Sequence, residues 1–152
     1  MIRDITKEDL DLWLELTGEF YTSEAVDHEI PLQNRQNTFN ALINKTPFAK
    51  GAFIEYENEV VGYVLLAITF SQEAGGECVW IEELYIREPY RSKGLGKKVF
   101  EWVEQSFPNH YRLRLEVEDD NTRAIKLYEK LGFERLNYSQ MIKDNLLSLK
   151  RK

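Results

Sequence analysis

Two adjacent acidic residues, Glu82 and Glu83, interrupt an otherwise apolar segment, residues 80–86, that is rich in β-branched and aromatic side chains. That composition is typical of a β-strand. A carboxylate on such a strand can take the proton of an alkylammonium group, whose pKa of about 10.4 keeps it charged at neutral pH. Because neighbouring side chains of a regular strand point to opposite faces, we expect at most one of the two acids in a given cleft. The alternative is that both acids only pair with nearby Arg or Lys side chains.

The segment that follows, residues 87–97, combines a turn at Pro89 with two glycines, Gly94 and Gly96, and runs into a helical pattern. The first N–H groups of a helix have no partner within it, and the helix dipole adds partial positive charge there. Glycines let an oxyanion approach these N–H groups closely. The basic side chains around this spot are Arg87, Arg91, Lys93, Lys97 and Lys98. The pattern predicts an anion site, with phosphate as the best match.

The glycine loop differs from two common nucleotide-binding motifs. It lacks the Gly-Lys-Ser/Thr sequence of a P-loop. A dinucleotide fingerprint has more in its favour, because Glu116 or Glu118 follows at the expected offset of about 20 residues. However, Val99 occupies the third glycine position, and the stretch between Ile86 and Gly94 is too long for the tight turn of that fold. A nicotinamide-dependent oxidoreductase is therefore only a minor alternative.

Composition indicates one soluble domain of 152 residues. A net charge of −6 argues against nucleic acid as a partner, apart from the local basic loop. With one cysteine, Cys78, and no apolar run near 20 residues, we expect a cytoplasmic protein without a membrane segment. His28 and His110 lack metal-ligand spacing, so no metal site is predicted. Acids outnumber bases in residues 1–30, which suits a cationic acceptor but is also typical of solvated helix faces.

Periodicity and turn signals predict an α/β fold with a mixed sheet and helices on both faces. Antiparallel hairpins surround one strand–helix–strand crossover, residues 79–117. The predicted strands are residues 1–5, 50–56, 59–70, 80–86, 111–117 and 134–142. Predicted helices start at Thr6 (as cap), Pro31, Gly96 and Thr122, and the last of them closes at Gly132 in a left-handed conformation.

Two motifs in the right order resemble the GNAT superfamily of acetyl-CoA-dependent N-acetyltransferases. Residues 91–96, Arg-Ser-Lys-Gly-Leu-Gly, match the family's Arg/Gln-x-x-Gly-x-Gly/Ala motif. Residues 121–133 resemble its second hallmark, Asn-x-x-Ala-x-x-Leu/Phe-Tyr-x-x-x-Gly-Phe. The resemblance covers residues 50–143, and residues 1–49 correspond to the family's variable, substrate-shaping part. It implies a single GNAT domain over residues 1–152 with about six to seven strands.

The resemblance also implies how acetyl-CoA is held. The diphosphate would lie on the loop made by Arg91, Ser92, Lys93, Gly94, Leu95, Gly96 and Lys97. The pantetheine arm would lie along Leu84, Tyr85 and Ile86, where neighbouring strands splay apart. The hydroxyl of Tyr128 would reach the CoA sulfur, although its helical position alone suggests a core aromatic. Asn121 would cap its helix and also contact the cofactor.

Residues 80–86 are most similar to the polyamine/diamine branch of that family, whose base aligns with Glu82; Glu83 remains the alternative base. The irregular loop and the strand would contribute acceptor-binding residues, namely Tyr21, Glu24, His28 and Glu83. We therefore expect transfer of acetyl to a primary amine of a small, cationic acceptor. A CoA-binding regulatory module without catalysis is the alternative, and a homodimer is common in the family. Cys78, with no nearby histidine in sequence, is interpreted as structural rather than as a nucleophile.

Overall fold

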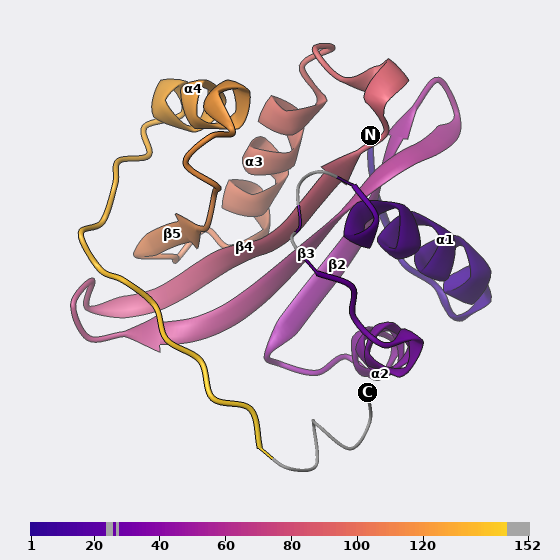
Figure 1. The fold of residues 1–152 in the computed structure, drawn as a ribbon, viewed down its shortest axis with the longest axis horizontal. Helices are drawn as coiled ribbons and strands as arrows, with labels where there is room; N and C mark the ends of the chain where they lie inside the picture. Colours follow the sequence, from indigo (N-terminus) through magenta and orange to yellow (C-terminus); the bar gives the residue numbers. More distant parts are fainter. Residues whose placement is uncertain (24–25, 27, 146–152) are drawn as a thin grey trace.

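A five-stranded sheet with the strand order β1-β2-β3-β4-β5 runs through the computed structural model, which describes residues 1–23, 26 and 28–145 (Figure 1). The strands are β1 (Ile2–Asp4), β2 (Ala49–Tyr56), β3 (Glu59–Ser71), β4 (Gly76–Ile86) and β5 (Arg112–Leu115). The helices are α1 (Leu10–Tyr21), α2 (Leu32–Ile43), α3 (Leu95–Ser106) and α4 (Thr122–Lys130). The first four strands pair antiparallel, whereas β5 runs parallel to β4 because α3 provides the crossover.

Local signals fix most of the element ends. The carboxylate of Asp9 accepts a hydrogen bond from the Thr6 N–H and so caps the turn that leads into α1. Pro31 immediately precedes α2. The β2–β3 turn has Glu57 and Asn58 at φ of 51° and 67°, the left-handed pair that suits a tight hairpin. These features confirm the predicted cap, the helix start and the hairpin.

Helices cover both faces of the sheet, as predicted (Figure 1). On one face, α1 and α2 bury an aromatic cluster that includes Trp13, Phe53 and Tyr63. On the other face, α3 packs Val99 and Val103 into an aliphatic cluster formed by the middle strands. Strand β5, at the edge of the sheet, packs into this same cluster, which α3 and α4 cover. None of the described helices is long and apolar enough to cross a membrane.

The C-terminal part of the fold differs from the sequence prediction. The sheet has five strands rather than six to seven, and residues 134–142, predicted as a strand, have no regular secondary structure. A strand exists only where a neighbour completes its ladder of hydrogen bonds, and a groove separates this segment from β5. For the same reason β5 is limited to Arg112–Leu115 instead of residues 111–117, since β4 pairs with it only up to Ile81.

Candidate active site

A β-bulge at Glu82 brings the two predicted acids to one face of the sheet. In the ladder between β3 and β4, Ile81 and Glu83 pair with successive residues of β3, so Glu82 has no partner there. Ile81 and Leu84 both pack into the cluster under α3, which shows that the alternation slips by one residue. The charges of Glu82 and Glu83 both raise the pKa of Tyr21, on the α1 side. The prediction that the acids point to opposite faces is wrong, because it assumed a regular strand.

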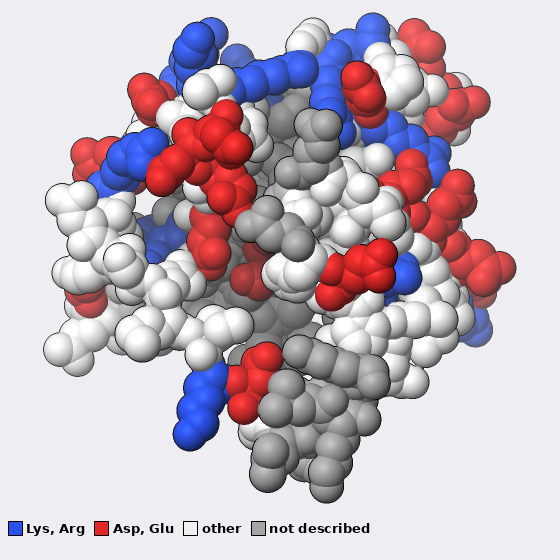
Figure 2. Space-filling model, viewed as in Figure 1, with Lys and Arg blue, Asp and Glu red and all other residues white. Residues whose placement is uncertain are grey.

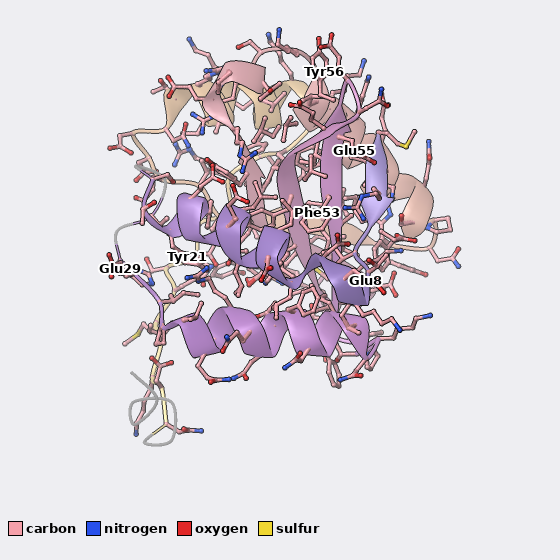
Figure 3. The ribbon with its side chains drawn as sticks, turned by 90° about the vertical axis from the view of Figure 1, so that its right-hand side faces the viewer. Glu8, Tyr21, Glu29, Phe53, Glu55 and Tyr56 are labelled. Carbon is pink, nitrogen blue, oxygen red and sulfur yellow. The ribbon has the colours of Figure 1, made fainter. Side chains whose placement is uncertain are left out.

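Two phenols hold the carboxylate of Glu83. Tyr21, at the C-terminal end of α1 (Figure 3), donates to one oxygen, and Tyr63 of β3 donates to the other over 2.7 Å. Burial raises the pKa of Glu83, and these two hydrogen bonds oppose that rise. Burial beside Glu83 raises the pKa of both phenols as well, so they remain donors at neutral pH. Glu83 is thus a fixed carboxylate whose two oxygens already accept hydrogen bonds.

Glu82 has no hydrogen-bond or ion-pair partner within residues 1–23, 26 and 28–145. Although part of its side chain is exposed, burial raises its pKa, and the negative charges of Glu83 and Glu116 raise it further. A carboxylate with a raised pKa is a stronger base than an ordinary one. The two acids differ in their hydrogen bonds: Glu83 would have to lose those from Tyr21 and Tyr63 to accept a proton, whereas Glu82 has none to lose among the described residues.

Strands β4 and β5 separate next to these acids. Their pairing stops at Ile81, so the backbone of residues 84–86 has no ladder partner on β5. A cleft of about 1310 Å³ opens there, between this strand end, the loop before α3 and the start of α4. In the space-filling view, basic side chains gather over α4 and the loop before α3, and acidic side chains run from there towards the hollowed centre of the face (Figure 2).

The loop before α3 has the backbone geometry of an anion site. Gly94 caps α3 in a left-handed conformation at φ 78°, and Ser92 has a φ of 62°. The first bond of the helix runs from the Lys98 N–H to the Gly94 carbonyl, so the earlier N–H groups of α3 stay free for a ligand. A Cβ on Gly96 would lie 3.2 Å from a methyl of Leu127, so glycine allows α3 and α4 to approach closely.

The side chains of the loop have separate roles. Arg91 donates from Nε to the Ile86 carbonyl over 2.7 Å and so secures the end of β4. Ser92, Leu95 and Lys97 line the cleft, whereas the ammonium of Lys93 lies 5.6 Å from the ring centroid of Tyr56 and does not line it.

Arg87 does not belong to the group of cations that sequence reasoning placed around the anion site. Its guanidinium pairs with Glu15 at 3.0 Å and with Glu19 at 2.8 Å, which ties β4 to α1. Arg123 at the start of α4 takes a place at the cleft instead, and it donates a hydrogen bond to the Ser92 hydroxyl.

Helix α4 brings Asn121 and Tyr128 to the same cleft. Asn121 caps the helix by accepting from the Ala124 N–H at 3.3 Å, which confirms its predicted capping role. Tyr128 is half-buried, with its ring edge-on to Phe100, and burial raises its pKa. It lines both the cleft and the groove of about 1120 Å³ beside β5.

The structure joins only part of the predicted acceptor set. Tyr21 and Glu83 are in direct contact, but His28 is exposed and lines neither of these two cavities, and Glu24 lies outside the described residues. Sequence reasoning missed Tyr63 as a contributor, because a buried aromatic residue on a strand carries no local sign of its partner. Within the described ranges no group of three or more His, Cys, Asp or Glu residues could hold a metal ion.

Comparisons with known proteins agree with this geometry. A family model described as the acetyltransferase (GNAT) family matches residues 10–133. The spermine/spermidine N(1)-acetyltransferase of Bacillus subtilis is 29% identical over 92 residues, which cover 57% of this chain and 60% of that protein. The thialysine N-epsilon-acetyltransferase of Bos taurus is 34% identical over 83 residues, covering 53% and 48% respectively. The matched part is thus less than two thirds of either relative.

Among solved structures, AAC(6')-Iy in complex with the bisubstrate analogue CoA-S-monomethyl-acetylneamine superposes with a TM-score of 0.78. The identity is 15%, and the match covers 95% of this chain and 97% of that one. At this identity the likeness concerns the fold, and it extends over nearly the whole of both chains.

Proposed function

Because the chain belongs to the acetyltransferase (GNAT) family, we propose that it transfers the acetyl group of acetyl-CoA to a primary amine of a small, cationic acceptor. The observation that carries the proposal is the bulge at Glu82. Because of the bulge, Glu82, which has no partner among the described residues, shares a face with the hydrogen-bonded Glu83, beside the point where β4 and β5 part. Residues 50–143 would form the cofactor-binding and catalytic part, and residues 1–49 would shape the acceptor site.

The backbone groups of the protein that line the cleft suit the diphosphate and the pantetheine arm of acetyl-CoA. The free N–H groups at the start of α3 suit the diphosphate, with Ser92, Gly94 and Lys97 around it. The unpaired edge of residues 84–86 suits the amide groups of the pantetheine arm, which can add to it like a strand. When bound, acetyl-CoA supplies an activated acetyl thioester.

Glu82 and Glu83 would divide the work on the acceptor amine. Glu83, fixed by its two phenol donors, would hold an ammonium group by charge. Glu82, whose pKa is raised, would take the proton that the reacting amine must lose, directly or through a water molecule. This division favours Glu82 over Glu83 as the base, because Glu83 would have to give up hydrogen bonds to serve.

Tyr128 would supply the proton of the leaving thiol. Tyr128 lines both cavities, and burial raises the pKa of its phenol, so the phenol carries its proton at neutral pH. Positioning of both reactants beside this phenol would provide much of the rate acceleration.

The two relatives described above are named for two classes of acceptor, polyamines and an amino acid, and we expect the acceptor of this chain in one of them. A thiol-release assay with acetyl-CoA against a panel of diamines, polyamines and amino acids tests the activity. Glu82→Gln and Tyr128→Phe should turn over slowly while still binding acetyl-CoA. Glu104→Gln, an exposed acid on α3, is the matched control and should behave like wild type. Acetyl-CoA binding with no thiol release for any amine would instead indicate a CoA-binding module without catalysis.

A further inference from the structure

Gly62 lies in β3 at a point where the backbone of the neighbouring strand comes very close. It is buried and pairs with Ile86 near the end of β4. A Cβ on Gly62 would overlap the carbonyl oxygen of Tyr85 and would lie only 3.0 Å from the Cα of Ile86. Glycine inside a strand weakens the strand unless a bulge or a close backbone approach requires it. At position 62 the close approach of β4 requires glycine.

The atoms that a side chain at position 62 would meet cannot turn aside. The three nearest heavy atoms all belong to the backbone of β4, so any larger residue would have to move the strand itself. Gly51 of β2 shows the contrast. A Cβ there would meet methyl groups of Leu42 and Ile5 at 2.8 Å and 3.1 Å, and the ends of such side chains can adjust.

The end of β4 lies between Gly62 and the cofactor cleft. In the sheet order β3-β4-β5, Gly62 approaches β4 from the β3 side, whereas the cleft opens on the β5 side and is lined by residues 84–86. Gly62 itself lines neither this cleft nor the groove beside β5. A side chain at position 62 would therefore push the end of β4 away from β3 and into the cleft.

The backbone of β3 is adapted to this contact on both sides of the strand. Val61, next to Gly62, has no partner on β2, because the ladder between β2 and β3 shifts its register there. Such a bulge bends its strand and increases the local twist. The carbonyl of Val61 accepts a hydrogen bond from the Arg87 N–H over 2.8 Å, which holds the chain against β3 just beyond the end of β4.

We infer that Gly62 is a positioning residue for acetyl-CoA. Because it has no side chain, the end of β4 can lie against β3, which leaves the edge of residues 84–86 free for the pantetheine arm. Gly62 acts through the backbone of Tyr85 and Ile86 and does not touch the ligand. This inference rests on the proposed function, in which the arm adds to that edge. The diphosphate would lie on a different segment, the loop before α3, so the two parts of the cofactor can be tested separately.

Two ligands separate the contribution of the arm from that of the nucleotide. One is acetyl-CoA, and the other is 3′-phosphoadenosine 5′-diphosphate, which is the same molecule without the acetylated pantetheine. Calorimetry should give a lower Kd for acetyl-CoA in the wild type. Gly62→Ala should reduce the ratio of the two affinities about ten- to hundredfold, the effect of losing two backbone hydrogen bonds, with the affinity for the nucleotide unchanged. Gly51→Ala, the matched control, should keep the wild-type ratio even where it lowers the melting temperature.

Hydrogen exchange of the amides of residues 84–86 gives a second readout, which the wild type alone provides even if Gly62→Ala does not fold. Acetyl-CoA should slow this exchange in the wild type and in Gly51→Ala, and the nucleotide should not. In Gly62→Ala, acetyl-CoA should no longer slow it.

The other outcomes count against the inference. Equal losses of affinity for both ligands in Gly62→Ala would make the glycine structural only, and so would a Gly62→Ala protein that does not fold while Gly51→Ala does. A wild-type affinity ratio in Gly62→Ala, or unchanged exchange of residues 84–86 when acetyl-CoA binds the wild type, would overturn the inference while the proposed function stands. If the wild type does not bind acetyl-CoA at all, the proposed function itself fails.

Discussion

Replacing Tyr63 by phenylalanine removes a single oxygen atom beside the acidic pair and leaves the aromatic packing in place. Tyr63 is fully buried, its ring lies edge-on to Trp13 at 5.1 Å between centroids, and its hydroxyl donates to Glu83 over 2.7 Å. A hydrogen bond to a charged group contributes about 1.5–3 kcal/mol. We expect Tyr63→Phe to lose roughly that amount of unfolding free energy when Glu83 is ionised, or about 3–12 °C in melting temperature.

The size of this loss should depend on pH. Burial holds the pKa of Glu83 above its ordinary value, and the hydrogen bond from Tyr63 opposes the rise, so the variant should have a still higher pKa. Between the pKa of the unfolded chain and the raised pKa, the folded protein binds more protons, so stability falls as pH rises. The loss of unfolding free energy caused by Tyr63→Phe therefore grows as the pH rises from the pKa of Glu83 in the wild type to its higher pKa in the variant.

Thermal denaturation followed by circular dichroism at about pH 4, below the ordinary pKa of a glutamate, and at about pH 9 measures this difference. We expect a small deficit at the lower pH and the full deficit at the higher one. Tyr85→Phe is the control, because the Tyr85 hydroxyl donates to Glu19 at 3.5 Å rather than to Glu83. Equal deficits at both pH values would refute the link to ionisation of Glu83, and no deficit at either would show that the hydrogen bond contributes nothing.

Four further predictions concern the reaction centre and the loop before α3. Glu82→Gln should lower kcat/KM by about 10²–10⁴-fold with acetyl-CoA binding unchanged by calorimetry, and wild-type turnover would exclude its role as base. Glu116→Gln removes a charge that raises the pKa of Glu82, so the acidic limb of the pH–rate profile should move to lower pH; an unmoved limb would contradict this coupling. Tyr128→Phe should lower kcat about 10²-fold without weakening acetyl-CoA binding, and loss of binding instead would make the residue structural. Gly94→Ala adds a methyl group in open space at φ 78°, so urea denaturation should register about 1–2 kcal/mol of backbone strain, whereas full stability would mean that the loop relaxes.

The contrast between what neighbouring residues encode and what contacts between distant residues decide is clearest at Glu82 and Glu83. The segment 80–86 is a strand and carries the carboxylates, as its composition predicts. Whether Glu82 and Glu83 share a face depends on the bulge, and the bulge is a property of the pairing between β3 and β4. Likewise, the sequence alone predicts that Tyr63 is an ordinary core aromatic. Its contact with Glu83, which Tyr21 also contacts, exists only because α1, β3 and β4 meet in the folded protein.

The same contrast applies at the edge of the sheet. Residues 134–142 alternate like a strand, but the groove beside β5 leaves them without a ladder partner, and Tyr138, Met141 and Ile142 remain exposed. The sequence pattern could not predict that Arg87 pairs with α1. Nor could it predict that Arg114 stacks on Trp80 without an ion-pair partner in the part of the chain that the structure describes. Each depends on which side chains meet across more than 30 residues of chain.

By itself, the sequence determined the features that a few adjacent residues encode: the left-handed Gly132, the Asn121 cap, the Glu57–Asn58 turn and the family motifs. Backbone sterics and side-chain-to-backbone hydrogen bonds act over one or two turns, so they can be read along the chain. Only the tertiary structure decided that two phenols hold Glu83, whereas Glu82 and Arg114 have no hydrogen-bond or ion-pair partner among the described residues. Strand register and helix packing set those relations, because they bring together side chains that the sequence keeps far apart.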